Sequence, residues 1–272
     1  MCMLPYLNIF SRRIPTYGIA AAVGILLGYW YLRRRTRALP LRDQAELELA
    51  YLFGMVGTFV GAKLLSLLTQ LPQLLQDLRV PAFTASMLIE KYLSGGFVFY
   101  GGLYGALLGA FIYLKAVRRN VWGALRVLLP LVPLVHGFGR VGCFLMGCCY
   151  GVPSRFGIAF TCTPIAPNGV RLLPVQLIEA AGEGVLFFAL TRPGAQRRGG
   201  QWMLGVYLAS YGVLRFLLEF FRGDDYRGFL GALSLSQVIS IATLVFAVLL
   251  LIISIQNRSK KPRRVFAADG EK

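Results

Sequence analysis

The sequence predicts an all-α integral membrane protein with about seven transmembrane helices. Of its 272 residues, 56% are hydrophobic and only 15% are charged, with a mean hydropathy of +0.61. A soluble domain carries roughly 25% charged residues. Apolar runs near the roughly 20 residues needed to cross the hydrocarbon core recur along the chain. The basic residues gather in short blocks between these runs, a pattern typical of multi-pass proteins.

The seven expected spans form a single membrane domain, residues 1–256, followed by a basic tail, residues 257–272. The first apolar run is followed by others, so it is a span and not a cleavable signal peptide. A short amphipathic stretch, about 72–92, separates the second span from the third. Pro130 and Pro133 should kink the fourth span. The spans are expected at about 15–32, 45–70, 95–117, 121–146, 174–192, 200–221 and 233–255.

The basic blocks predict the orientation in the membrane. Five, three, three and five Lys or Arg residues follow the first, third, fifth and seventh spans, and fewer follow the others. Lys and Arg are retained on the cytoplasmic side, so we expect the N-terminus outside and the C-terminus in the cytoplasm. The net charge of +17 is thereby explained by topology and by attraction to anionic lipids, and we expect no nucleic-acid partner.

Glycines recur at four-residue spacing within the expected spans. Small residues at this spacing let two helices approach closely in lipid. We therefore expect close helix packing at Gly57 and Gly61, and at Gly101, Gly105 and Gly109.

Two arginines within the spans need partners or a water-filled cavity, because an arginine at mid-membrane costs roughly 2.5–3.5 kcal/mol. Arg215 either pairs with Glu219 four residues further on, or binds an anion together with Arg140. Arginine binds phosphate through two parallel hydrogen bonds. A phospholipid phosphate is the anion that a cavity open to lipid meets, so a central lipid-accessible cavity is expected.

The fourth span ends in a dense polar cluster. If it stays helical, His136, Arg140 and Cys143 lie at positions i, i+4 and i+7 on one face. His136 is then a hydrogen-bonded packing residue, a proton acceptor or a neighbour of the phosphate. Cys143, Cys148 and Cys149 lack a standard zinc spacing, so we expect neither a metal nor a cofactor. The cysteines are small packing residues or include a thiol activated by Arg140 or His136.

Several stretches, in order, resemble one known family. Gly139–Cys148 is similar to the signature Gly-Arg-x-x-Asn-Phe-x-Asn-x-Glu of the prolipoprotein diacylglyceryl transferases of bacterial plasma membranes. The resemblance covers about 15–256. The other matching pieces are Tyr17-Gly18, Gly61-Ala62-Lys63, Tyr100-Gly101-Gly102-Leu103, Pro174-Val175-Gln176-Leu177-Ile178-Glu179, and Tyr211-Gly212-Val213-Leu214-Arg215, continuing to Arg222.

The resemblance implies a multi-pass enzyme of the bacterial plasma (inner) membrane. Such enzymes move the diacylglyceryl group of phosphatidylglycerol onto the lipobox cysteine thiol of a prolipoprotein, with release of glycerol-1-phosphate. It implies Arg140 and Arg215 as catalytic residues, with Tyr100 at the position of the family's histidine; His136, where the family pattern requires no histidine, is added as a catalytic candidate from its place beside Arg140. The resemblance also implies phospholipid-binding residues, with Cys143 and Cys148 as a second tier. The phospholipid-binding residues are Arg140, Arg215, Tyr17, Lys63, Gly101, Gly102, Gln176, Glu179, Tyr211 and Arg222.

The sequence departs from the family pattern in its polar network. Tyr100 replaces a histidine, Lys63 replaces an arginine, and Cys143, Met146 and Cys148 replace two asparagines and a glutamate. A tyrosine is a poor base at neutral pH, so we hypothesise that His136 supplies the lost base. Three alternatives stay open: a divergent relative with another acceptor, a phospholipid-binding membrane protein without catalysis, and a thiol or metal protein that uses Cys143, Cys148, Cys149 and His136.

Overall fold

The computed structural model describes residues 3–9, 12–80, 84–93, 98–224, 229–231 and 233–257. The chain divides into two compact units, Met1–Arg37 with Trp122–Lys272, and Ala38–Val121. Each unit is described by itself. Residues 258–272 of the expected basic tail lie outside the described residues.

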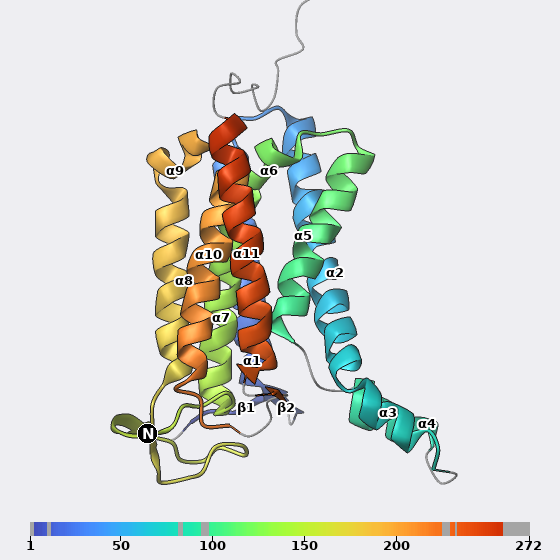
Figure 1. Cartoon of the computed structure of the whole chain (residues 1–272), viewed down its shortest axis with the longest axis vertical. Coiled ribbons are helices and arrows are strands. Elements are labelled where there is room, and N and C mark those ends of the chain that lie inside the picture. The colour runs from blue at the N-terminus through green and yellow to red at the C-terminus, as the bar shows by residue number, and fades with distance from the viewer. Residues whose placement is uncertain are drawn as a thin grey trace, which may run out of the picture. The chain divides into compact units, whose positions relative to one another are not determined.

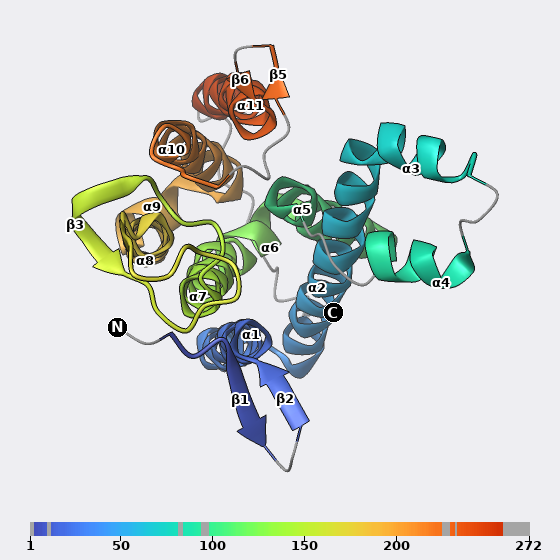
Figure 2. The same ribbon diagram turned by 90° about the horizontal axis from the view of Figure 1, so that it is seen from below.

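The first unit is built mainly from helices, most of them long. In chain order they are α1 (Thr16–Thr36), α6 (Val121–Leu128), α7 (Leu131–Met146), α8 (Val175–Thr191), α9 (Pro193–Arg198), α10 (Gly200–Glu219) and α11 (Leu235–Gln256). α1 packs on α7, α7 on α8, α8 on α10, and α10 on α11. Seen from below, these five helices follow one another around an arc (Figure 2).

The predicted proline break is confirmed. Leu129 and Pro130 separate α6 from α7, and Pro130 is the N-terminal capping residue of α7. Pro133 lies in the first turn of α7. The backbone N–H groups of a first turn have no acceptor within the helix, so the N–H that proline lacks costs no hydrogen bond there. α7 therefore runs unbroken from Leu131 to Met146 and carries the polar residues of the fourth span on one continuous helix.

Within the described residues, three short antiparallel hairpins add to the helices, and the sequence did not predict them. They are β1 (Tyr6–Ile9) with β2 (Arg12–Pro15), β3 (Pro153–Ala159) with β4 (Arg171–Leu172), and β5 (Phe229–Leu230) with β6 (Leu233–Ser234). β3 and β4 lie in the segment between the fourth and fifth expected spans, where no secondary structure was predicted. This segment is anchored by an apolar cluster under the end of α7, formed by Met3, Phe144, Phe160, Ala166 and Leu172.

The second unit is a helical hairpin with a small appendage. α2 (Leu41–Thr69) packs along α5 (Phe99–Ala116). The expected amphipathic stretch between them folds into α3 (Leu71–Asp77), α4 (Ala85–Leu88) and a π-helical turn, η1 (Ile89–Leu93). Figure 1 shows α2 and α5 side by side along much of their length.

Glycines bring α2 and α5 into backbone contact, as the four-residue spacing predicts. A Cβ atom on Gly105 would lie 2.1 Å from the carbonyl oxygen of Gly57, and one on Gly61 would lie 2.3 Å from that of Gly101. No side chain fits at such distances. At the opposite end of the hairpin, Arg119 forms ion pairs with Asp43, at 2.7 Å, and with Glu46.

The described helices are those of a membrane protein. Three helical segments are long and apolar enough to cross a bilayer: Leu41–Thr69, Val121–Met146 and Leu235–Gln256. Large apolar side chains are exposed along them, as on α11, where Val245, Phe246 and Leu249 face outward. The all-α membrane class is therefore confirmed, while the number of seven spans stays a prediction.

Candidate active site

His136 lies between a carboxylate and a guanidinium. Its Nδ1 is 2.6 Å from Oε1 of Glu183 on α8, and its Nε2 accepts a hydrogen bond of 3.1 Å from Nε of Arg140. Because Arg140 only donates, Nε2 carries no hydrogen and the Nδ1–H donates to Glu183. The histidine is thus held as one tautomer, and its Nε2 lone pair is taken up by the hydrogen bond from Arg140.

Arg140 is the centre of a network that joins three helices. It is 8% exposed, and its Nη2 lies 2.9 Å from Oε1 of Glu179 on α8. The same carboxylate oxygen accepts a hydrogen bond of 3.0 Å from the hydroxyl of Tyr211 on α10. The Tyr211 ring meets His136 edge to face, with 5.3 Å between ring centroids. Arg140, Glu179 and Tyr211, all predicted site residues, therefore lie together with His136.

Arg215 is buried on α10, and only some of the hydrogen-bond donors of its guanidinium have a partner. Its Nη2 lies 2.7 Å from Oε2 of Glu219 and 3.2 Å from Oγ of Ser236, which confirms the predicted pairing one helical turn apart. Its Nη1 has no hydrogen-bond partner among the described residues. The charges of Arg140 and Arg215 both act on His136. A buried guanidinium with a spare donor is suited to an incoming anion.

The end of the signature stretch is a loop held from two sides. Gly147 ends α7 in the left-handed conformation, φ +73°. The side chain of Gln176 on α8 donates a hydrogen bond of 2.7 Å to the carbonyl of Cys148. Gly151 pairs with Arg222 as an isolated β-bridge. The loop is therefore fixed both to α8 and to the segment that follows α10.

Arg222 is engaged by acidic residues of its own segment. It binds both carboxylate oxygens of Asp224, and its Nη1 is 3.8 Å from Oε2 of Glu219. Burial alone would lower the pKa of Arg222, but the hydrogen bonds with Asp224 raise it above its ordinary value. The guanidinium therefore stays charged beside the loop.

Tyr17, on the first turn of α1, packs against the middle of the signature stretch. A Cβ atom on Gly142 would lie 3.1 Å from both Cα and Cδ2 of Tyr17. The side chain is partly exposed. Tyr17 thus lies against the same helix that carries Arg140.

The remaining predicted site residues belong to the second unit, where packing explains two of them. Gly101 faces the backbone of Gly61, and Gly102 faces Thr58. Tyr100 is buried and its ring stacks on Tyr104, with 6.4 Å between centroids. Lys63 on α2 is half-buried. These contacts fit a helix-packing role for the glycines, and the binding roles of all four predicted residues stay predictions.

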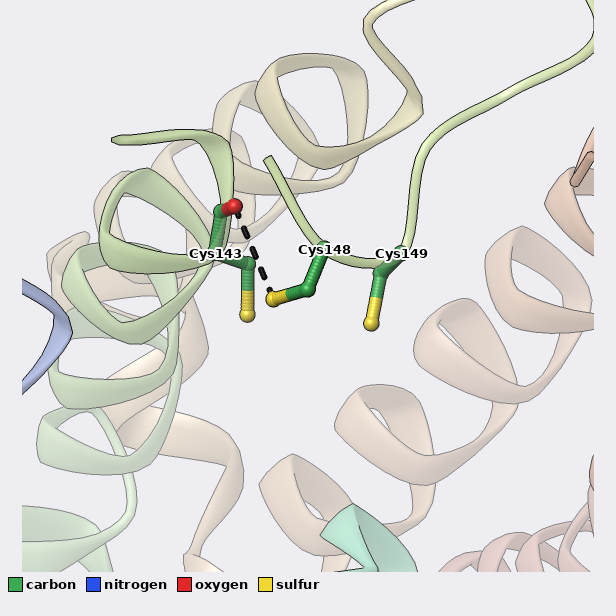
Figure 3. A group of neighbouring side chains, drawn as sticks. All are labelled: Cys143, Cys148 and Cys149. Atoms are coloured by element: carbon green, nitrogen blue, oxygen red, sulfur yellow. Dashed lines mark hydrogen bonds between the residues drawn. The ribbon is translucent and has the colours of Figure 1, made fainter. Parts of the chain in front are cut away.

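Sequence reasoning missed three participants. Glu183 was visible as a carboxylate within a span, but its histidine partner is 47 positions away along the chain. Ser236 gave no signal at all. Cys149 was visible only as a neighbour of Cys148, and its sulfur lies close to those of Cys143 and Cys148 (Figure 3).

Comparison with known proteins places the chain in a family. Residues 6–253 match the family model of the prolipoprotein diacylglyceryl transferases. A phosphatidylglycerol–prolipoprotein diacylglyceryl transferase of Clostridium tetani is 33% identical over 244 residues, 89% of this chain and 93% of the relative. A Clostridium perfringens protein named phosphatidylglycerol–prolipoprotein diacylglyceryl transferase 2 is 32% identical, over 89% and 92% of the two chains. The match to the family model and the identity to these relatives over most of the sequence lead to one conclusion: this chain belongs to the prolipoprotein diacylglyceryl transferase family.

Proposed function

We propose that the chain transfers the diacylglyceryl group of phosphatidylglycerol to the lipobox cysteine thiol of a prolipoprotein. Glycerol-1-phosphate is the other product, and a thioether links lipid to protein. Membership of the transferase family and the names of relatives that align over about nine-tenths of the chain support this function. The residues of the first unit supply a physical basis for it.

The observation that carries the proposal is the pair of buried arginines, one of which is hydrogen-bonded to His136. Arg140 and Arg215 are 8% and 4% exposed, on helices α7 and α10. The phosphodiester of phosphatidylglycerol carries one negative charge and becomes a monoester with more charge as it leaves. Hydrogen-bond donors that are already fixed around this growing negative charge lower the activation barrier, because they need not reorganise during the reaction. The unsatisfied Nη1 of Arg215 provides one such donor.

Phosphate binding and proton acceptance are linked through Arg140. When the phosphate engages this guanidinium, Nε withdraws from His136 and frees the Nε2 lone pair. The thiol proton then passes to Nε2, and Glu183 stabilises the resulting imidazolium through Nδ1–H. The sulfur forms a bond to the terminal glycerol carbon of the diacylglyceryl group. The bond between that carbon and the phosphate oxygen breaks, and its electron pair leaves with glycerol-1-phosphate.

The other predicted residues are assigned to holding the lipid. Gln176 and Arg222 fix the loop beside Arg140, and Tyr17 packs on the same helix. We assign Lys63 and Tyr100 to phospholipid contacts, together with the Gly101-Gly102 pair. A cavity open to the lipid phase is part of this proposal, because both substrates are anchored in the membrane.

We also infer a seven-span topology in the bacterial plasma membrane. Seven long helical segments, α1, α2, α5, α6 with α7, α8, α10 and α11, correspond in order to the seven predicted spans. Basic residues follow α1, α5 and α8, which puts these ends on the cytoplasmic side. The N-terminus is then outside, where secreted prolipoproteins arrive. The segment 1–256 forms one membrane domain in this proposal.

The test uses the purified full chain in lipid nanodiscs with head-group-labelled phosphatidylglycerol and a lipobox peptide. We expect release of labelled glycerol phosphate together with a peptide whose mass increases by a diacylglyceryl group. Release without peptide modification would mean that another acceptor is used. Saturable lipid binding without any release would show that the chain binds phospholipid without catalysis. Either of these two results would overturn the proposed reaction.

A further inference from the structure

Three cysteine thiols converge at the end of α7. Their Sγ atoms all lie within 4.8 Å of one another: Cys143 comes from the helix, and Cys148 and Cys149 come from the loop that follows it. Figure 3 shows the three side chains pointing to the same side of the loop. All three cysteines are free, whereas Cys162 is disulfide-bonded.

The backbone is shaped to bring these sulfurs together. Gly147 turns the chain with φ +73°, and a Cβ atom there would lie 2.4 Å from Oγ1 of Thr163. Cys149 itself has φ +56°, in the left-handed region that non-glycine residues seldom adopt. Two left-handed residues with Cys148 between them turn adjacent side chains toward one side. Such conformations persist only where the surroundings impose them, and they gather at functional sites.

The surroundings also fix the cluster in place. Gln176 holds the carbonyl of Cys148, and the Cys148 thiol donates to the Cys143 carbonyl at 3.6 Å. Gly151 is bridged to Arg222, and the Gly223 amide donates to the Tyr150 carbonyl at 3.0 Å. Three side chains are thereby held on a rigid support rather than on a free loop.

Positive charge lies next to the sulfurs. The guanidinium groups of Arg140 and Arg222 both act on Cys149. Three thiolates binding a monovalent ion carry a net charge of −2, which Arg140 and Arg222 offset in part, since both also pair with carboxylates. A half-buried cluster of negative sulfurs would be costly without such partners.

We propose that Cys143, Cys148 and Cys149 form a three-thiolate binding site for a soft, thiophilic cation of the Cu⁺ class. Soft thiolate ligands select Cu⁺ and Zn²⁺. Metal–sulfur bonds of about 2.3 Å place the sulfurs of a three-coordinate site about 4 Å apart, so the sulfurs need to close by less than about 1 Å. This proposal departs from the expectation of no metal, because that expectation rested on the spacing of zinc ligands in the sequence and the three sulfurs converge in space. Binding forms three metal–sulfur bonds and releases the thiol protons to solvent.

The test is an anaerobic titration of the purified full chain with Cu⁺ in ascorbate, which leaves the Cys162 disulfide intact. We expect one equivalent to bind in competition with a bathocuproine chelator, with a thiolate-to-copper charge-transfer band. X-ray absorption should find three sulfur neighbours. Cys149→Ser should weaken binding at least about tenfold, and the triple serine variant should not bind. Met203→Leu, which removes a buried sulfur from α10, is the matched control and should bind as the native chain does.

A second measurement needs no variant and therefore does not depend on their folding. Bound Cu⁺ should protect Cys143, Cys148 and Cys149 from maleimide, which mass spectrometry of the digested native chain counts directly. The assignment is overturned if the native chain fails to compete with the chelator. It is also overturned if the three cysteines stay reactive with copper bound, or if the triple serine variant binds equally well. None of these readouts depends on the transferase reaction.

Discussion

Arg140 donates its Nε hydrogen to Nε2 of His136 over 3.1 Å, so the lone pair that would accept a proton is occupied until Arg140 moves. Glu183 holds the other ring nitrogen at 2.6 Å. In the proposed reaction, an anion that draws Arg140 away is therefore the trigger for proton acceptance by His136. Binding of the lipid phosphate is thereby linked to activation of the thiol.

The first prediction separates a base from a positioning residue at His136. In His136→Gln the amide oxygen still accepts from Arg140, whereas in His136→Ala nothing does. Neither variant can take a proton, so both should lose about 10²-fold or more in kcat, the usual contribution of general base catalysis. Steady-state kinetics should give a KM for phosphatidylglycerol near the native value for the glutamine variant and a higher one for the alanine variant.

Two outcomes would reject the base role. Full turnover by His136→Ala would show that His136 is dispensable. Native kcat in His136→Gln would show that the residue only positions Arg140.

The second prediction concerns the buried arginines. Arg140→Lys and Arg215→Lys each keep the charge but replace a planar fork of donors by a single ammonium. Loss of one fixed donor to a developing oxyanion costs about 10²–10³-fold in rate, so each variant should lose about that much in kcat/KM. Labelled glycerol phosphate release measures this loss.

The matched control for the arginines is Arg34→Lys at the end of α1, where the guanidinium lies over the Trp30 ring, 5.4 Å from its centroid. Its activity should be native within about twofold, because an exposed charge far from the reaction contributes little. A loss as large as that of the buried arginines would mean that lysine substitution harms the chain in general.

The third prediction tests the glycine contact between α2 and α5. Gly105→Ala places a methyl group 2.1 Å from the Gly57 carbonyl oxygen, so the two helices must separate. Overpacking of this kind costs about 1–3 kcal/mol, and thermal unfolding in detergent should occur at a lower Tm.

Gly184→Ala on α8 is the control for this substitution. No atom lies within 4 Å of the added Cβ, and alanine favours helix over glycine by about 1 kcal/mol. Its Tm should be unchanged or slightly higher. Equal losses in both variants would show that helix packing is not the cause.

The fourth prediction concerns pH and the appendage between α2 and α5. Asp77 binds Nζ of Lys91 at 2.5 Å and the hydroxyl of Tyr92 at 2.7 Å. The hydrogen bond from Lys91, and then that from Tyr92, holds the pKa of Asp77 below its ordinary value. A carboxyl whose folded pKa is lowered contributes stability above its unfolded pKa near 4, and that stability is lost as pH falls through the folded pKa.

Hydrogen exchange in residues 71–93 should therefore be slow at pH 7 and, after correction for intrinsic rates, faster below about pH 4. Asp77→Asn should show the faster exchange already at pH 7. Protection independent of pH in the native chain would contradict the role of Asp77.

The sequence predicted what depends on local spacing. α11 runs from Leu235 to Gln256, close to the expected span. An uninterrupted apolar run in lipid forms a helix, because a helix satisfies all backbone hydrogen bonds within the segment. The Arg215–Glu219 pair follows from positions one turn apart on a helix. The contact of Gly57 with Gly105 follows from two matching small-residue repeats.

What the sequence could not predict depends on three-dimensional convergence. Glu183 and His136 are 47 residues apart, and nothing in either segment specifies their registry. The three sulfurs meet because Gly147 and Cys149 adopt left-handed conformations, and for Cys149 no residue preference announces this. The β3–β4 hairpin was missed because Phe156 is exposed and Leu172 is buried, without the alternation that marks a longer strand.

The double attachment of the loop that carries Cys148 has a mechanical consequence. Gln176 ties it to α8, and Gly151 ties it to Arg222 beyond α10. A loop attached at one point can move independently of the helices. This loop is attached both to α8 and to the segment that follows α10, so it moves only together with them. Opening this end of the molecule to a peptide therefore requires a joint tilt of α8 and α10. Such a tilt would at the same time alter the distance between Arg215 on α10 and Arg140 on α7.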